Sequence, residues 1–155
     1  MLYENFFEHF NNFNKIIQLI DKKIGGRCKL ETRPTSDYEM RVKFRYKPSE
    51  WENDNTIITL AIANDGIKCW YASVAPTDSN DLIKFFMYYN CALSDLWCKN
   101  NILFDAFKID EEKIDLVTKE VNKLLDLWET GAKIREKMQK QIEINISKFA
   151  FTKED

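Results

Sequence analysis

The stretch that decides the fold reads Glu39-Met40-Arg41-Val42-Lys43-Phe44-Arg45-Tyr46-Lys47. From Met40 onward, its apolar side chains alternate strictly with basic ones. A period of two is typical of a β-strand, because successive side chains point to opposite faces of a sheet. The stretch therefore predicts a strand at 39–47 with one apolar face and one wholly cationic face.

The segment just upstream continues this pattern. At alternate positions from Arg27 to Arg33 the side chains are basic, except at Glu31. Residues 34–38 contain the Pro, Ser and Asp that are common in turns. Together, 27–33 and 39–47 predict a hairpin with a basic outer face. Its candidate partner-binding residues are Arg27, Lys29, Arg33, Arg41, Lys43, Arg45 and Lys47.

A second hairpin is predicted at 56–63 and 67–74, around Asn64-Asp65-Gly66. Asp-Gly between apolar runs is a strong hairpin signal, because the tightest hairpin turns need positive φ at both central residues. Both strands are apolar on nearly both faces, so we expect them in the interior of the sheet. Two consecutive hairpins predict a four-stranded antiparallel sheet over 27–74.

Helical periodicity surrounds this sheet. Residues 2–24 carry an apolar stripe that Gly25 and Gly26 end. Residues 79–98 are apolar over most of a helical circumference, and 111–148 form either one bent helix or two, interrupted at Gly131. We therefore expect a single α+β domain over 1–155, with one helix before the sheet, a helical region of two or three helices at 79–148, and a frayed tail at 149–155.

The core should contain the residues that these elements must bury. They are Phe10, Phe13, Ile17, Ile20, Val42, Phe44, Leu60, Ile62, Phe85, Tyr89, Leu96, Val121 and Leu125.

Composition narrows the classes of function. No apolar run reaches the roughly 20 residues that span a bilayer, and we see no signal peptide, so we expect a cytoplasmic protein without a membrane partner. The abundance of Ile, Asn and Lys points to an AT-rich genome, such as that of a low-GC bacterium or its phages. The cysteines Cys28, Cys69, Cys91 and Cys98 form no CxxC pair, so we expect reduced thiols, no metal and no cofactor.

Catalytic patterns are weak. His9 is the only histidine and lacks an evident acid-base partner, and no phosphate-binding glycine loop follows a predicted strand. Glu111-Glu112-Lys113 is better explained as acid enrichment at a helix start than as part of a metal-dependent nuclease. We therefore do not expect an enzyme, and a small metal-dependent nuclease stays a remote alternative.

Charge is unevenly spread along the chain. Residues 27–47 hold seven basic side chains against three acidic ones, whereas 48–128 hold fourteen acids against seven bases. The sequence pI near 5.6 argues against general nucleic-acid affinity. Phe44 and Tyr46 also share the buried face, unlike the exposed aromatics of sheet-based RNA readers. We expect the basic face to meet an acidic protein surface or a ribonucleoprotein, including a short phosphate-backbone contact; the alternative is a solvated strand face that discourages aggregation.

These features favour a non-enzymatic binding protein that inhibits or modulates a macromolecular partner, such as a phage or mobile-element antagonist of a bacterial defence complex. Two alternatives are an immunity-type protein that neutralises a toxin and a nucleic-acid-binding accessory protein. The helix at 80–98 is a candidate homodimer interface, because aromatic side chains favour interfaces. The secondary interface candidates are Trp51, Phe86, Tyr88 and Trp97.

Overall fold

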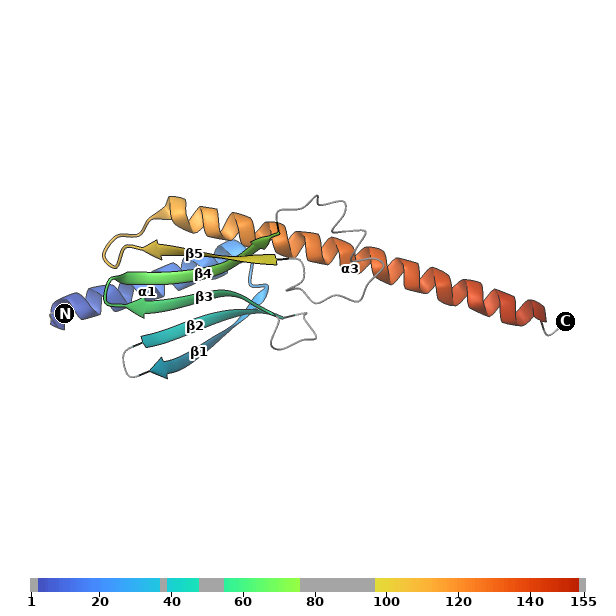
Figure 1. The fold of residues 1–155 in the computed structure, drawn as a ribbon, viewed down its shortest axis with the longest axis horizontal. Coiled ribbons are helices and arrows are strands. Elements are labelled where there is room, and N and C mark those ends of the chain that lie inside the picture. The colour runs from blue at the N-terminus through green and yellow to red at the C-terminus, as the bar shows by residue number, and fades with distance from the viewer. Residues whose placement is uncertain (1–2, 37–38, 48–54, 76–96, 154–155) are drawn as a thin grey trace.

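A computed structural model describes residues 3–36, 39–47, 55–75 and 97–153. The fold is α+β, with a helix first and an antiparallel sheet after it, as the sequence predicts. In chain order the elements are α1 (Tyr3–Ile24), β1 (Cys28–Ser36), β2 (Glu39–Tyr46), β3 (Thr56–Ala63), β4 (Gly66–Val74), β5 (Trp97–Phe104) and α3 (Glu111–Lys153) (Figure 1).

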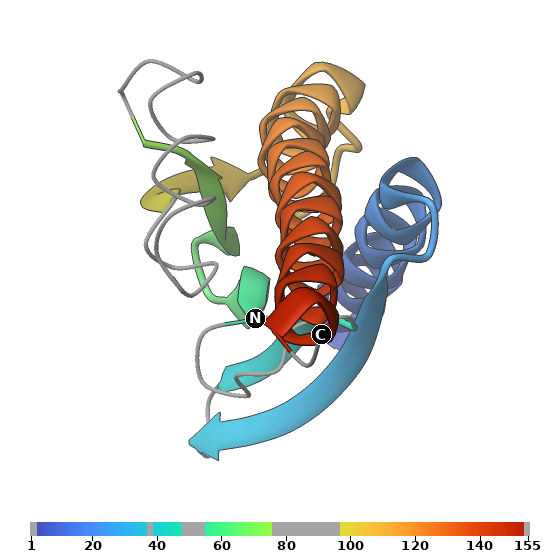
Figure 2. The same ribbon diagram turned by 90° about the vertical axis from the view of Figure 1, so that its right-hand side faces the viewer.

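The described strands form one five-stranded sheet in the order β1-β2-β3-β4-β5, with every neighbouring pair antiparallel. Val42 lies opposite Leu60, Leu60 opposite Cys69, and Cys69 opposite Ile102, so one apolar row crosses four strands. The sheet curls around α1 and α3, which both lie on its inner side (Figure 2). The outer face of the sheet is therefore convex.

The core lies between the sheet and the two helices. Its members include Phe13, Ile16 and Ile20 from α1 and Val117, Val121 and Leu124 from α3. Most of the predicted core is confirmed, because eight of its members are buried: Phe13, Ile17, Ile20, Val42, Phe44, Leu60, Val121 and Leu125. Phe10 and Ile62 are half-buried, and Phe85, Tyr89 and Leu96 lie outside the described residues.

The prediction of four strands is wrong, because residues 97–104 add β5 along the edge of β4. Trp97 and Cys98 therefore lie in a strand, and not at the end of the helix that the sequence predicts over 79–98. Without β5, the backbone groups along that edge of β4 would lack these strand partners. The rest of the predicted helix, 79–96, lies outside the described residues.

The prediction of two or three helices after the sheet is also wrong for the described residues, where Glu111–Lys153 is one continuous helix. Asp110 caps its start, because the Lys113 backbone N–H donates to the Asp110 carboxylate at 3.2 Å. Gly131 does not end the helix, and α3 continues past Lys148, where fraying was expected. From residue 139 to 149 every side chain is exposed, and this half of α3 projects beyond the sheet (Figure 1).

Glycines set two of the turns. Gly25 and Gly26 have φ of 74° and 68°, and the Gly26 N–H donates to the Asp21 carbonyl at 3.3 Å, which closes α1 as predicted. In the β3–β4 hairpin Gly66 has a φ of 147°, but Asp65 does not have the positive φ that we expected. A Cβ at Gly66 would lie 2.6 Å from the Phe104 carbonyl oxygen, so the close approach of β5 also requires glycine here.

Candidate binding surface

The register places alternate residues of all five strands on the outer face, away from α1 and α3. In one row Lys43 lies opposite Thr59, Thr59 opposite Trp70, and Trp70 opposite Asn101. In the next row Arg41, Ala61, Lys68 and Leu103 follow one another in the same way. We define the outer face by these two rows together with Lys29, Glu31, Arg45, Trp97 and Lys99.

Basic side chains extend over this face from edge to edge. The basic row predicted for the first hairpin is continued by Lys68 on β4 and Lys99 on β5, which the sequence did not reveal. Along a strand the cations repeat about every 7 Å, which is twice the rise per residue. Among the outer-face residues defined above, only Glu31 is acidic.

Two of the cations are held by neighbours on the sheet. Arg45 Nε lies 3.0 Å from Glu31 Oε2, and these two side chains are only 18% and 26% exposed. The Arg41 guanidinium carbon lies 5.2 Å from the centroid of the Trp70 ring. These contacts fix the guanidinium groups in place before any partner arrives.

Three lysines of the outer face form no ion pair among the described residues, although Glu31 lies opposite Lys43 in the register of β1 and β2. Within the part of the chain that the structure describes, Lys29, Lys43 and Lys68 take part in no ion pair. Lys29 and Lys68 are exposed and Lys43 is half-buried. Their charges are therefore available to an anionic partner.

Two tryptophans share the face with these cations. Trp70 and Trp97 are both half-buried, and Lys99 Nζ lies 5.6 Å from the centroid of the Trp97 ring. Beside Trp70 the surface has a hollow of about 350 Å³, lined by Asp65, Lys68, Cys69, Trp70, Asn101, Ile102 and Leu103. Sequence reasoning found Trp97 as an interface candidate but placed it on a helix, and it missed Trp70.

The remaining predicted partner-binding residues lie elsewhere. Arg27 precedes β1, and its guanidinium donates to the Ile24 carbonyl at 3.1 Å, to Asp126 at 2.8 Å and to Asn122 at 2.6 Å. Lys47 follows β2 and donates to the Gly26 carbonyl at 3.2 Å. Arg33 lies opposite Arg41 in the sheet register, although its side chain is not described. Trp51, Phe86 and Tyr88 lie outside the described residues.

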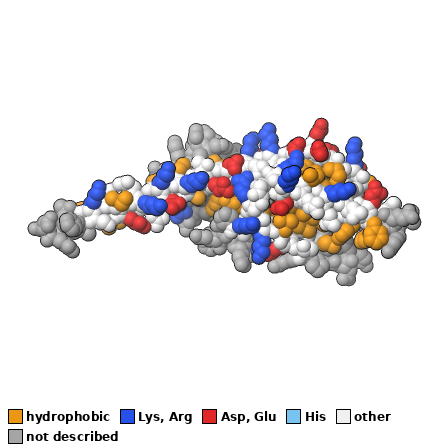
Figure 3. All heavy atoms as spheres, turned by 180° about the vertical axis from the view of Figure 1, so that it is seen from behind, with side chains coloured by type: hydrophobic (Ala, Val, Ile, Leu, Met, Phe, Trp, Pro, Cys, Tyr) orange, Lys and Arg blue, Asp and Glu red, His pale blue; other side chains and the backbone are white. Residues whose placement is uncertain are grey.

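The opposite side of the molecule has a different character. Figure 3 shows it from behind, and there basic and acidic side chains are intermingled along the helices. The acidic side chains of the described helices are therefore interspersed with lysines, whereas only one of the outer-face residues defined above, Glu31, is acidic.

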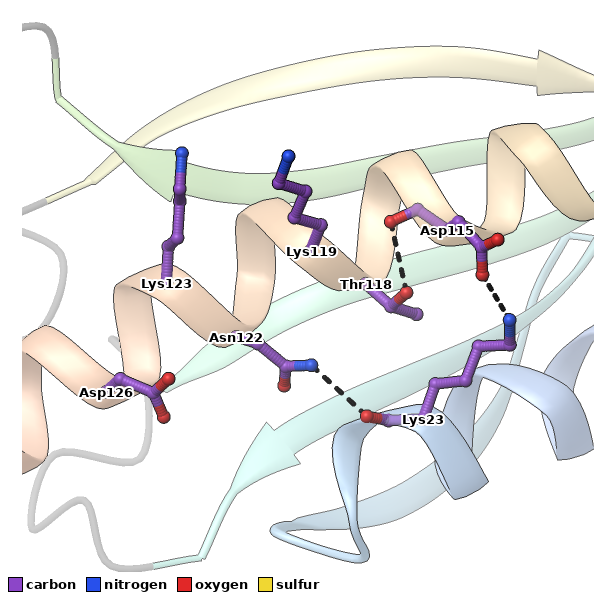
Figure 4. Close-up of a pocket in the computed structure, with 7 residues that line it drawn as sticks. All are labelled: Lys23, Asp115, Thr118, Lys119, Asn122, Lys123 and Asp126. Carbon is purple, nitrogen blue, oxygen red and sulfur yellow. Dashed lines mark hydrogen bonds and ion pairs between the residues drawn. The ribbon is translucent and has the colours of Figure 1, made fainter.

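A second hollow, of about 540 Å³, lies between the end of α1 and α3 (Figure 4). Its polar groups mostly contact one another: Lys23 pairs with Asp115, and the Asn122 amide donates to the Lys23 carbonyl at 3.1 Å. Lys119 and Lys123 extend side by side from successive turns of α3 (Figure 4). This set holds the two helices together and contains no nucleophile paired with a base.

His9 also occupies a structural position. Its side chain is buried, and its ring lies 6.0 Å from the ring of Phe107, centroid to centroid. Neither ring nitrogen has a hydrogen-bond partner among the described residues. A general base needs both a partner and access to substrate, and the described residues offer His9 no hydrogen-bond partner.

The thiols and carboxylates of the described ranges form no metal-binding cluster. No group of three His, Cys, Asp or Glu side chains there could hold a metal ion. Cys28, Cys69 and Cys98 are unpaired, and burial raises the pKa of Cys28 and of Cys69 to about 12. Those two thiols stay protonated near neutral pH and are poor nucleophiles. Cys91 lies outside the described residues.

In the same ranges, no helix combines the length and the apolar character needed to cross a membrane. Comparison with known protein families, with curated proteins and with solved structures finds no match to this chain.

Proposed function

We propose that this protein is a non-enzymatic binding protein, which inhibits or modulates a macromolecular partner by placing the outer face of its sheet on an acidic surface. The observation that carries the proposal is a set of lysines on three strands of one face, Lys29, Lys43 and Lys68, which form no ion pair among the described residues. Strands hold these side chains at fixed spacing, so several can meet anionic groups at once.

The neighbouring contacts support a binding role over a merely solvated face. The Glu31–Arg45 pair and the stacking of Arg41 on Trp70 order part of the surface in advance. Preorganised groups lose less conformational entropy on association, which favours affinity. Solvation alone would not require an aromatic ring beneath a guanidinium.

The concrete version that we favour is a phage or mobile-element antagonist of a bacterial defence complex, acting in the cytoplasm. It draws on the AT-rich residue usage and on the one-sided charge of the outer face. An immunity-type protein that neutralises a toxin would use the same face in the same way.

A pair of matched variants tests the proposal. The outer-face variant is Lys29→Glu/Lys43→Glu/Lys68→Glu, and the helix variant is Lys119→Glu/Lys123→Glu/Lys133→Glu. Both change the net charge equally, and neither removes an ion pair seen among the described residues. Arg41 and Arg45 are kept, because their contacts on the sheet would confuse binding with stability.

Each tagged protein is used to capture partners from a low-GC bacterial lysate, and circular dichroism confirms that the variants are folded. We expect wild type and the helix variant to recover the same partner and the outer-face variant to lose it. Equal recovery by all three proteins would show that the outer face is only a solvated surface.

A nucleic-acid-binding accessory protein is the second candidate function. The specific observation that favours it is the presence of Trp70 and Trp97 on the basic face, because aromatics and cations together suit nucleic-acid strands.

A further inference from the structure

We infer that the acidic surface recognised by the outer face is a single strand of nucleic acid. This inference rests on the proposed function, because it names the partner of the same face. Three features of that face carry it: the spread of its cations, the placement of its two indoles, and the hollow beside Trp70.

The cations suit a chain of phosphates. Arg41 and Lys43 repeat along β2, and Lys68 lies two strands away from Arg41, opposite Ala61. These spacings are about 7 Å along a strand and about 10 Å across two strand separations. Lys99 extends the basic part of the outer face onto β5, so a flexible polyanion can cross the sheet from β2 to β5.

The indoles suit bases. Trp97 lies opposite Val74, which is four residues along β4 from Trp70, so the backbone positions of the two tryptophans are about 13 Å apart in the strand direction. One short strand can therefore reach both. Proteins that bind single strands combine such stacking platforms with a positively charged path for the backbone.

The hollow beside Trp70 suits one base with its sugar. Its volume of about 350 Å³ is at the small end of ligand pockets, which begin near 300 Å³. Among the lining residues, the Asn101 amide offers both a donor and an acceptor to a base edge, Leu103 is apolar, Lys68 can meet a phosphate, and the Asp65 carboxylate can accept from a base amino group.

The same features disfavour a duplex and an acidic protein. The outer face is convex (Figure 2), so a rigid duplex would touch it along a narrow strip, whereas a flexible strand can follow the curve. A single strand supplies phosphates for the lysines, bases for the indoles and a nucleoside for the hollow, whereas clustered carboxylates would meet the lysines alone.

Fluorescence anisotropy with labelled 15-nucleotide dT and rU strands, and with a 15-base-pair mixed-sequence duplex, tests this inference. We expect both single strands, or one of them, to bind more tightly than the duplex. Three or four phosphate contacts predict that the affinity falls about 20- to 50-fold between 50 and 200 mM salt.

Variants locate the site. We expect Trp70→Ala to weaken binding about tenfold and Trp70→Phe, which keeps an aromatic ring, to weaken it much less. Trp128→Phe on α3 is the control for general effects of tryptophan replacement and should bind as wild type does. The outer-face variant should lose binding, and the helix variant should keep it.

The outcomes separate this inference from the proposed function. If no oligonucleotide binds while the outer-face variant still loses its captured partner, the nucleic-acid inference is wrong and the proposed function stands. The inference is equally overturned if the duplex binds as tightly as the single strands, or if folded Trp70→Ala and outer-face variants bind as wild type does.

Discussion

Phe44 shows how a single residue ties the basic strand to the core. Its side chain is fully buried on the inner side of β2, opposite Leu30 and Ile58, while its neighbours Lys43 and Arg45 lie on the outer face. We predict that Phe44→Ala lowers the free energy of unfolding by about 3–5 kcal/mol, because the deletion leaves a cavity. Urea denaturation measures this, and Lys43→Ala should change it by less than about 0.5 kcal/mol. A loss below about 1 kcal/mol for Phe44→Ala would mean that the core is misassigned.

Two buried thiols make stability depend on pH. The pKa of Cys28 and of Cys69 is raised from 9.0 to about 12 by burial, so the folded protein keeps protons that the unfolded chain loses. Their contribution is complete below pH 9 and is lost as pH rises toward 12. We predict a fall of about 1.4 kcal/mol per pH unit for each thiol above pH 9. Denaturation at pH 8, 9 and 10 measures it.

The matched control for that prediction is Cys28→Ala/Cys69→Ala, which should show a flatter profile between pH 8 and pH 10. Burial also raises the pKa of Tyr46 and of Tyr71, whose ordinary value is 10.0. Wild type and the double cysteine variant should therefore both lose stability above pH 10. An unchanged slope in the double variant below pH 10 would exclude the thiols as its cause.

At the scale of elements, the two halves of α3 differ in burial. Its first half supplies Ile114, Val117, Val121, Leu124 and Leu125 to the core, whereas every side chain from 139 to 149 is exposed. We predict that ending the chain after Lys140 changes the free energy of unfolding by less than about 0.5 kcal/mol while reducing the helical circular dichroism signal. Ending it after Asn122 removes Leu124 and Leu125 and should prevent folding. Marked destabilisation of the chain that ends after Lys140 would instead reveal a stabilising role for the projecting half of α3.

The elements differ in how far sequence could predict them. Period-two alternation in 39–47 and the Asp-Gly turn at 65–66 were sufficient for four strands, because local signals specify hairpins. Residues 97–104 lack such a signal, since Asn100 and Asn101 break the apolar pattern and Ile102, Leu103 and Phe104 are consecutive. Their strand is defined by pairing with β4, which is a tertiary contact that local patterns do not record.

At the scale of the whole molecule, only half of the candidate site was predictable. The alternation of side chains along the two strands of the first hairpin predicts that one face of the sheet carries Lys29, Arg41, Lys43 and Arg45. Trp70, Lys68 and Lys99 joined them only through the register of β3, β4 and β5. In β4 both faces are mostly apolar, so the sequence alone does not say which side chains point outward.

Arg27 belongs to the fold of the whole molecule and not to its binding face. It joins the end of α1, the start of β1 and the first half of α3 through hydrogen bonds to Ile24, Asn122 and Asp126. We predict that Arg27→Ala lowers the free energy of unfolding by about 1.5–3 kcal/mol, because it leaves these acceptors without their charged donor. Arg27→Lys should recover only part of the loss, since an ammonium cannot span acceptors that a planar guanidinium reaches together. Denaturation measures both variants, and partner capture below the unfolding transition should match wild type. A stable Arg27→Ala protein that no longer captures the partner would instead move Arg27 onto the binding surface.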